Sequence, residues 1–288
     1  MSEPERTLPP RPDSLERILS LFPNVLFIVF AAVGLTTAGV ASPSLGLDTA
    51  MGALLLAYSA TILVSGAVNR LGARRFQPVN AEGVAALVRG ELDRAARTFE
   101  PGMRRWSVSA RCTARHNLGL TRARQGEVRR AIALFAYNVR HPLRGALRAQ
   151  SALELTICLA LVGELDLAQA WLIESERRVA KQSPGLKAAA EYAKALLDCR
   201  GGRSVEAARA LETSWPDIEG HYPVSFARPI RVVRAFAETE ANGPREAGTT
   251  ARLLMDMRPR FPGEYDWLGV EWPEMRVFLE THGLKASA

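Results

Sequence analysis

The chain has 288 residues and a formal charge of +7, with 37 lysines and arginines against 30 aspartates and glutamates. This length is enough for one sizeable core or a short array of repeats. The three cysteines, Cys112, Cys158 and Cys199, lie 46 and 41 residues apart, which excludes a disulfide framework and a paired-cysteine metal motif and agrees with a reducing compartment.

The first 20 residues predict a disordered head that leads into a short amphipathic helix. Met1–Pro12 holds four prolines and few apolar side chains, a composition typical of disorder. Asp13 or Ser14 can cap the helix that follows.

The stretch from Leu21 to Asn69 predicts a transmembrane hairpin, because it contains a single charged side chain, Asp48. Leu21–Ala41 and Thr49–Asn69 are 21 residues each. At about 1.5 Å per residue, either is long enough to cross a hydrocarbon layer of about 30 Å. The short segment between them is rich in proline, glycine and serine, which favours a tight turn.

Two other interpretations of this stretch stay open. Gly39-Val40-Ala41 has the small-residue pattern of a signal-peptidase site, although the apolar run is longer than a usual signal core. A hairpin buried inside a soluble protein is the other, and the scarcity of charge in so arginine-rich a chain disfavours it. Neither span contains lysine, arginine, glutamate or histidine, so transport through the hairpin alone is not expected.

Arginines on both sides of the hairpin predict its orientation. The head carries three arginines, the turn carries none, and the exit carries Arg70, Arg74 and Arg75. Positively charged flanks stay on the cytoplasmic side. We therefore expect both termini and the rest of the chain at the cytoplasmic face of a bacterial inner membrane.

The segment nearest the expected bilayer is strongly basic. Residues 69–148 hold 17 arginines against five carboxylates, a local net charge of +12. Arg70, Arg74 and Arg75 are candidates for contact with anionic lipid headgroups, which attract basic side chains by ~1 kcal/mol each close to the surface. An ordinary solvated arginine surface explains the charge equally well. Nucleic acid is a third interpretation, disfavoured because the segment has few aromatic side chains.

After the hairpin the chain repeats itself with a period near 36 residues, which predicts stacked helix pairs. The clearest unit consists of Asn117-Leu118-Gly119, Gly126, Ala131 and Phe135. Its end-piece recurs as Gly90, Ala95 and Phe99, as Gly163, Ala168 and Leu172, and in a looser form after Gly201-Gly202.

Each position of the end-piece has a physical reason. Glycine accepts the left-handed backbone angles of a bend between two helices. Alanine is small where the helices of a pair approach closely, and the large apolar residue one turn later fills the gap to the next pair. No alternating strand pattern occurs, so the expected fold class is all-α.

This pattern resembles the tetratricopeptide repeat (TPR) family. The resemblance is good over about residues 76–175, weaker in the fourth unit, and marginal across 223–256. It implies a right-handed TPR-like α-solenoid over residues 70–258. Arg115 and Arg122 depart from the family pattern, in which apolar or aromatic residues usually stand at these two positions.

The resemblance also implies a concave groove lined by the first helix of each pair. In the best unit it makes Thr113, His116, Leu120 and Arg124 face the groove, with Asn117 beside them. These five residues are the candidates for binding a protein partner.

The C-terminal segment 259–288 is expected to close the array. Residues 261–273 contain four aromatic side chains. A solenoid needs an element that covers its last exposed core, so a cap is the favoured interpretation. An aromatic anchor for a partner is the alternative.

The sequence contains no recognisable active site. Glycine-rich phosphate loops, a Gly-x-Ser-x-Gly elbow and a His-Glu-x-x-His motif are all missing from it. Cys112 and His116 lie four residues apart, but no second pair of ligands accompanies them, so no metal site is expected. We expect a protein that is not an enzyme and needs no cofactor.

The functional hypothesis is a membrane-anchored TPR-like scaffold or adaptor that holds a protein partner at the cytoplasmic face. It comprises the head (1–20), the hairpin (21–69), the repeat domain (70–258), and the cap and tail (259–288). The alternative is a structural subunit of a multi-span secretion, envelope or transport complex, in which the hairpin makes the specific contacts.

Overall fold

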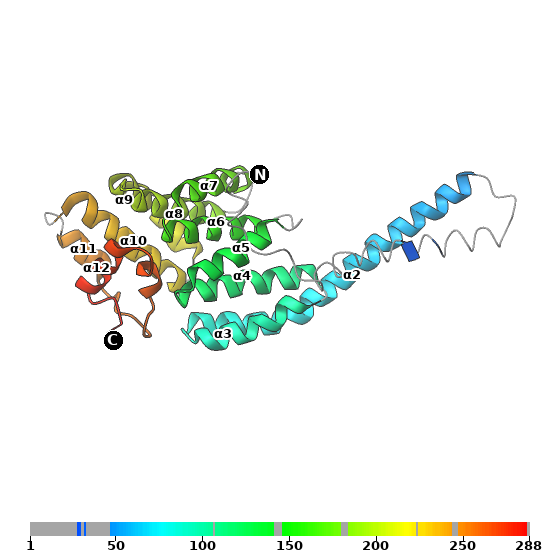
Figure 1. The fold of residues 1–288 in the computed structure, drawn as a ribbon, viewed down its shortest axis with the longest axis horizontal. Coiled ribbons are helices and arrows are strands. Elements are labelled where there is room, and N and C mark those ends of the chain that lie inside the picture. The colour runs from blue at the N-terminus through cyan, green and yellow to red at the C-terminus, as the bar shows by residue number, and fades with distance from the viewer. Residues whose placement is uncertain are drawn as a thin grey trace.

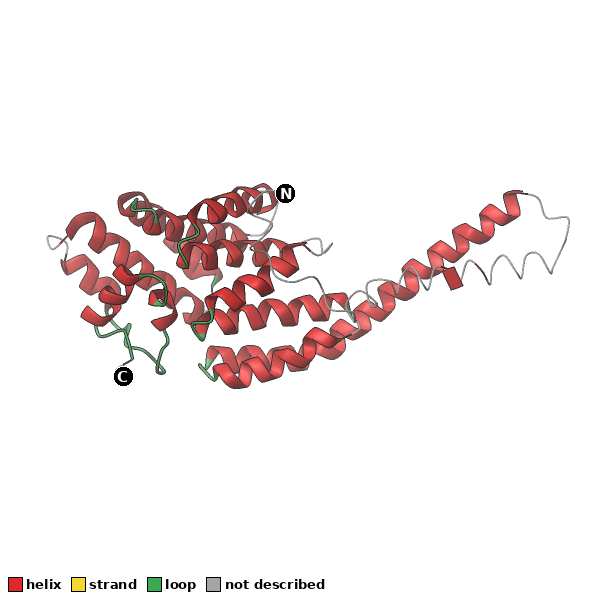
Figure 2. Cartoon of the chain, viewed as in Figure 1, coloured by secondary structure: helices red, strands yellow, loops and turns green. Residues whose placement is uncertain are grey.

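The computed structural model describes residues 28–29, 32, 47–105, 107–140, 146–179, 184–222, 224–243 and 247–286, and within them it contains helices and no strand. The predicted all-α fold class is confirmed for these residues (Figures 1 and 2). In chain order the helices are α2 (Leu47–Val88), α3 (Leu92–Phe99), η2 (Glu100–Arg104), α4 (Val108–Arg124), α5 (Val128–Arg140), α6 (Ala146–Leu161), α7 (Leu165–Val179), α8 (Pro184–Arg200), α9 (Ser204–His221), α10 (Val224–Asn242), α11 (Ala247–Leu254), η4 (Asp266–Gly269) and α12 (Pro273–Thr281).

The longest element is α2, a helix of 42 residues whose first half projects away from the packed helices (Figure 1). Large apolar side chains on this half are exposed, and Leu56 and Leu63 are each 73% exposed. The second half packs against α3 and α4. Pro78 lies inside the helix and lacks the N–H that would bond to the Arg74 carbonyl, yet the helix continues past it.

Within the described residues, the structure contains no helix that combines enough length and apolar character to cross a membrane. The predicted transmembrane hairpin is therefore not found there. Its first span, 21–41, lies outside the described residues except for 28, 29 and 32, and so does the whole head, 1–20. Its second span, 49–69, forms part of α2 and is continuous with the first helix of the predicted repeats.

Four turns between consecutive helices have the same backbone geometry. Gly90, Gly126, Gly163 and Gly202 have φ angles of 79°, 80°, 83° and 79°. At the first of these turns, Gly90 N–H donates to Leu87 O (3.2 Å) and Glu91 N–H donates to Ala86 O (3.0 Å). Equivalent pairs of bonds close the other three turns, so each helix ends in a Schellman motif.

The small and large positions after each turn are buried. Ala95, Ala131, Ala168 and Ala207 are all 0% exposed. The side chains four residues further on, Phe99, Phe135, Leu172 and Leu211, are also buried. In the first two pairs the phenylalanine ring packs on a glycine of the preceding helix, because a Cβ on Gly83 or Gly119 would lie 2.5 Å or 2.7 Å from it.

Arg115 and Arg122 stand where the family usually has apolar or aromatic residues, and the guanidinium of each contacts another side chain. Arg115 is buried, with its Cζ 3.7 Å from the centroid of the Tyr137 ring, a cation–π contact. Arg122 forms an ion pair of 2.6 Å with Glu100 and a longer one of 3.5 Å with Glu127. Stacking and ion pairing thus replace the apolar packing expected at these two positions.

The C-terminal segment covers more of the molecule than the last pair of helices. Trp272 packs in the core against Phe236 of α10, with ring centroids 5.0 Å apart. Further contacts reach the first two turns, since a Cβ on Gly90 would meet the Phe261 ring at 2.3 Å and one on Gly126 would meet Val270 at 3.2 Å. The segment therefore runs along the glycine turns back towards the start of the array.

Candidate functional site

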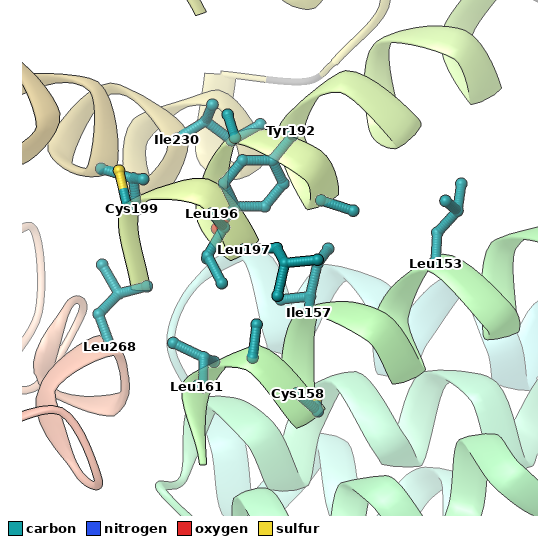
Figure 3. Packing of buried hydrophobic residues seen from close by; sticks show 14 of the residues in the cluster. Leu153, Ile157, Cys158, Leu161, Tyr192, Leu196, Leu197, Cys199, Ile230 and Leu268 are labelled. Carbon is teal, nitrogen blue, oxygen red and sulfur yellow. The ribbon is translucent and has the colours of Figure 1, made fainter. Parts of the chain in front are cut away.

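A small pocket lies where α4, α6, α8 and α10 meet the C-terminal segment. Its volume is about 40 Å³, and apolar side chains form most of its wall. Figure 3 shows the neighbouring core, in which Tyr192 of α8 lies between Ile157 of α6 and Ile230 of α10. The polar and aromatic residues that line the pocket are Arg124, Glu154, Tyr192, Tyr222, Phe226 and Trp267.

Arg124 lies in the last turn of α4 and points its guanidinium at two aromatic rings. Its Cζ lies 4.9 Å from the centroid of Phe226 and 5.9 Å from that of Trp267. Burial lowers the pKa of Arg124, and the negative charge of Glu154 opposes this shift. The cation is thus held against aromatic faces, as in cation–π recognition.

Glu154 is the single carboxylate of α6, in a stretch from Ser151 to Leu161 that is otherwise buried and largely apolar. Burial raises its pKa to about 7, and the charge of Arg124 acts in the opposite direction. Within the described part of the chain, no hydrogen bond or ion pair reaches its carboxylate. The site therefore holds an acid that titrates near neutral pH and lacks a fixed partner.

Tyr192 supplies a third polar group. Its side chain is 6% exposed, and its hydroxyl is buried without a hydrogen-bond partner among the described residues. Burial also raises the pKa values of Tyr192, Tyr222 and Cys158, so all three remain protonated at neutral pH. Buried hydroxyls are nearly always hydrogen-bonded, so an orphan one at a pocket wall is informative.

A wider cleft of about 560 Å³ adjoins the pocket and shares Arg124 and Trp267 with it. Asp93, Glu127 and Asp266 line this cleft and make its rim acidic. The cleft lies between the first two glycine turns and the C-terminal segment, beside the pocket.

The structure separates the five candidate groove residues into two sets. Leu120 and Arg124 line the pocket. Thr113 is half-buried and does not line it. Asn117 is buried, and its Nδ2 donates to Asn80 Oδ1 at 2.7 Å, so it joins α4 to α2 instead of facing a groove.

His116 is also a core residue. Its Nδ1 lies 3.0 Å from Ser151 Oγ, and its ring meets Phe135 edge-on at 5.6 Å between centroids. Burial lowers the pKa of His116 to about 4, so the imidazole is neutral at physiological pH. His116 therefore does not share an open groove face with Arg124, because α6 covers this side of α4.

Sequence reasoning missed Glu154, Tyr192, Tyr222, Phe226 and Trp267 as site residues. One local signal pointed to Glu154, since it is the lone charged residue in the apolar run from Ser151 to Val162. The aromatic residues carried no such signal, because they come from α8, α10 and neighbouring segments that only the packing brings to Arg124.

The remaining predicted sites are placed as follows. Arg70, Arg74 and Arg75 are exposed on α2. Cys112 is buried next to His116 on α4, and the described residues contain no cluster of three or more histidine, cysteine, aspartate or glutamate side chains that could hold a metal ion.

Comparisons of the chain with known protein families, with curated proteins and with solved structures give no match.

Proposed function

We propose that this protein is a membrane-anchored, TPR-like scaffold whose right-handed helical array holds a protein partner at the cytoplasmic face of the membrane. The observation that carries the proposal is the continuity of α2, which joins an arm with exposed apolar side chains to a packed helical domain. The pocket and its cleft supply the proposed surface for the partner.

The arm supports the membrane part of the proposal. Leu55, Leu56, Ile62 and Leu63 are each more than half exposed. Apolar side chains gathered on one element are costly in water and mark a surface that meets lipid or another protein. The apolar sequence before Leu47 belongs to the same proposed anchor.

The end of the arm supports contact with lipid headgroups. Ser107 Oγ lies 2.9 Å from Asn69 O and 2.8 Å from Asn69 Oδ1, and Ser109 N–H donates to Asn69 Oδ1. Asn69 directly precedes Arg70 of α2, and Ser107 follows Arg104 and Arg105, at the end of η2, by only a few residues. The resulting group, which we call the basic collar, consists of Arg70, Arg74, Arg75, Arg104 and Arg105.

All five side chains of the basic collar are exposed, and within the described residues none of them forms an ion pair. Many arginines elsewhere are paired, as Arg94 is with Glu82 and Arg129 is with Glu271. Unpaired cations at the end of an apolar arm suit the anionic headgroups of a bilayer.

The anchoring is tested by flotation of membranes from cells that express the full chain. We expect the protein to float with the membranes and to resist extraction by carbonate. A protein that stays at the bottom of the gradient, or that carbonate releases, would contradict the anchor.

Partner binding is tested by cross-linking in cells followed by mass spectrometry. We expect a stoichiometric partner that is lost from Arg124→Gln and kept by Arg209→Gln, an exposed arginine of α9 that lies outside the pocket. Exchange of residues 21–69 for an unrelated two-span anchor separates the alternative function. If complex formation then fails while the helical domain stays folded, the chain is a subunit of a larger membrane complex.

A further inference from the structure

We propose that the pocket formed by Arg124, Glu154 and Tyr192 binds a neutral primary carboxamide, the side-chain group of an asparagine or glutamine of the partner. This inference rests on the partner-binding role proposed above and adds the chemistry of the group that is recognised. It uses three polar groups at one cavity that form no hydrogen bond with any described residue.

The three groups differ in what they require. A guanidinium can only donate hydrogen bonds, an ionised carboxylate can only accept them, and a phenol can donate one. Arg124 and Tyr192 therefore need an acceptor, and Glu154 needs a donor. No described residue fills these roles, since the Tyr192 hydroxyl is an orphan and no hydrogen bond reaches Glu154.

A primary carboxamide satisfies all three groups at once. Its oxygen has two lone pairs, enough to accept from Arg124 and from Tyr192, and its amino group donates to Glu154. The ligand is neutral, so the opposite charges of Arg124 and Glu154 continue to balance each other. Buried charges that keep their balance avoid the desolvation cost of an uncompensated ion.

Charged ligands of the same shape fit less well. A carboxylate would satisfy Arg124 but would face the carboxylate of Glu154. An amidinium or ammonium group would satisfy Glu154 but would face Arg124. In either case one fixed group meets a like charge in a partly buried site, where such repulsion is strong.

The size of the cavity agrees with this assignment. One water needs about 10–15 Å³ by this measure, so the cavity of about 40 Å³ has room for about three non-hydrogen atoms. A carboxamide has three. Phe226 and Trp267 also line the pocket, where they provide apolar surface for the stem behind the amide.

The test uses the full chain in detergent micelles and three nearly isosteric probes: propionamide (neutral), propionate (anionic) and propionamidinium (cationic). Saturation-transfer NMR at pH 7.5 measures the dissociation constant of each. We expect propionamide to bind at least about tenfold more tightly than either charged probe, because each charged probe leaves one hydrogen-bonding group unpaired.

A matched pair of variants assigns the signal to the pocket. Tyr192→Phe removes one donor and should weaken propionamide binding about fivefold to tenfold. Tyr265→Phe removes another buried tyrosine hydroxyl, which does not line the pocket, and it should leave binding unchanged. Both substitutions delete a single oxygen atom and keep the aromatic ring, so both variants should fold.

Three outcomes would overturn the carboxamide site: equal or tighter binding of propionate, equal or tighter binding of propionamidinium, or equal binding of propionamide to Tyr192→Phe and wild type. The last would mean that propionamide binds without the Tyr192 hydroxyl, and so not in the proposed way. Partner capture is scored separately. If Glu154→Leu, which cannot accept a hydrogen bond, captures the partner as well as wild type does, the scaffold role stands and the carboxamide site fails.

Discussion

Burial changes the protonation of two side chains on adjacent helices in opposite directions. His116 on α4 has its pKa lowered from 6.5 to about 4. Between these pH values its imidazole is protonated in the unfolded chain and neutral in the folded protein. Glu154 on α6 has its pKa raised from 4.5 to about 7, so in that range the folded protein keeps a proton that the unfolded chain has lost. Falling pH therefore destabilises the fold through His116 and stabilises it through Glu154.

Single substitutions should separate the two effects. As the pH falls from 6.5 to 4.5, the free energy of unfolding of Glu154→Gln should fall relative to wild type by up to about 2 kcal/mol. The reason is that this variant lacks the stabilisation that protonation of Glu154 provides. His116→Gln should show the reverse slope of similar size. Urea unfolding of the full chain at several pH values measures both. Variant curves that run parallel to the wild-type curve would contradict the assignment.

Two glycines with open surroundings offer a test of backbone conformation alone. A Cβ on Gly202 or on Gly220 would touch nothing within 4 Å, but Gly202 has a φ of +79° and Gly220 lies in the helix α9. Gly202→Ala should destabilise the protein by about 1 kcal/mol, since alanine avoids the left-handed region. Gly220→Ala should stabilise it by about 0.5–1 kcal/mol. Thermal unfolding measures the difference, and shifts of the same sign would refute the argument.

The turns between helices are the elements that could be read from the sequence. A Schellman turn is local, because its glycine and both of its hydrogen bonds fall within six residues of chain. The spacing from Gly90 to Gly126 to Gly163 therefore marked three turns correctly, and the looser fourth unit, with its turn at Gly202, has the same bonds.

The boundary between anchor and repeats could not be read in the same way. Hydropathy placed it at residue 69, where the apolar stretch ends and the arginines begin. The helix does not end at that change, because no helix-stop signal occurs there, and α2 continues to Val88. The change in hydropathy and the end of the helix therefore fall at different residues of the chain.

The C-terminal segment is an element whose contribution to stability can be measured. Trp272 is 2% exposed and packs on Phe236 and under Arg200, whose Cζ lies 5.3 Å from its ring. Trp272→Ala should lower the free energy of unfolding by about 3–5 kcal/mol. Val277→Ala, at a 60% exposed position of α12, should change it by less than about 0.5 kcal/mol. Similar small losses in both variants would mean that the segment is only loosely attached.

At the scale of the whole molecule, the pocket explains why the site was only partly predictable. Arg124 was a candidate because the resemblance to TPR repeats placed it on the groove-facing side of its helix. Glu154, Tyr192 and Trp267 lie 30, 68 and 143 residues further along the chain. Their meeting depends on how successive pairs curve and on where the C-terminal segment returns, and neither is encoded in a local pattern.

The basic collar also depends on the whole molecule, and it gives a prediction for the protein in a bilayer. In nanodiscs with anionic lipid, residues 100–105 should be protected from hydrogen exchange, and the protection should fall in Arg104→Gln/Arg105→Gln by about 2 kcal/mol, at about 1 kcal/mol for each arginine. Arg177→Gln/Arg209→Gln, at exposed positions outside the collar, is the control. Equal protection in neutral nanodiscs would exclude a role for the headgroups.

The contact between Asn69 and Ser107 has one more consequence. A Cβ on Gly72 would lie 2.5 Å from Ser107 Cβ, so the two helices meet there too closely for any other residue. The described part of the chain from Leu47 to this contact is one continuous helix. One residue inserted near Gly66 would rotate the arm by about 100° and advance it by about 1.5 Å while the array stayed still. The number of residues in the arm therefore sets how the helical domain is oriented about the axis of α2.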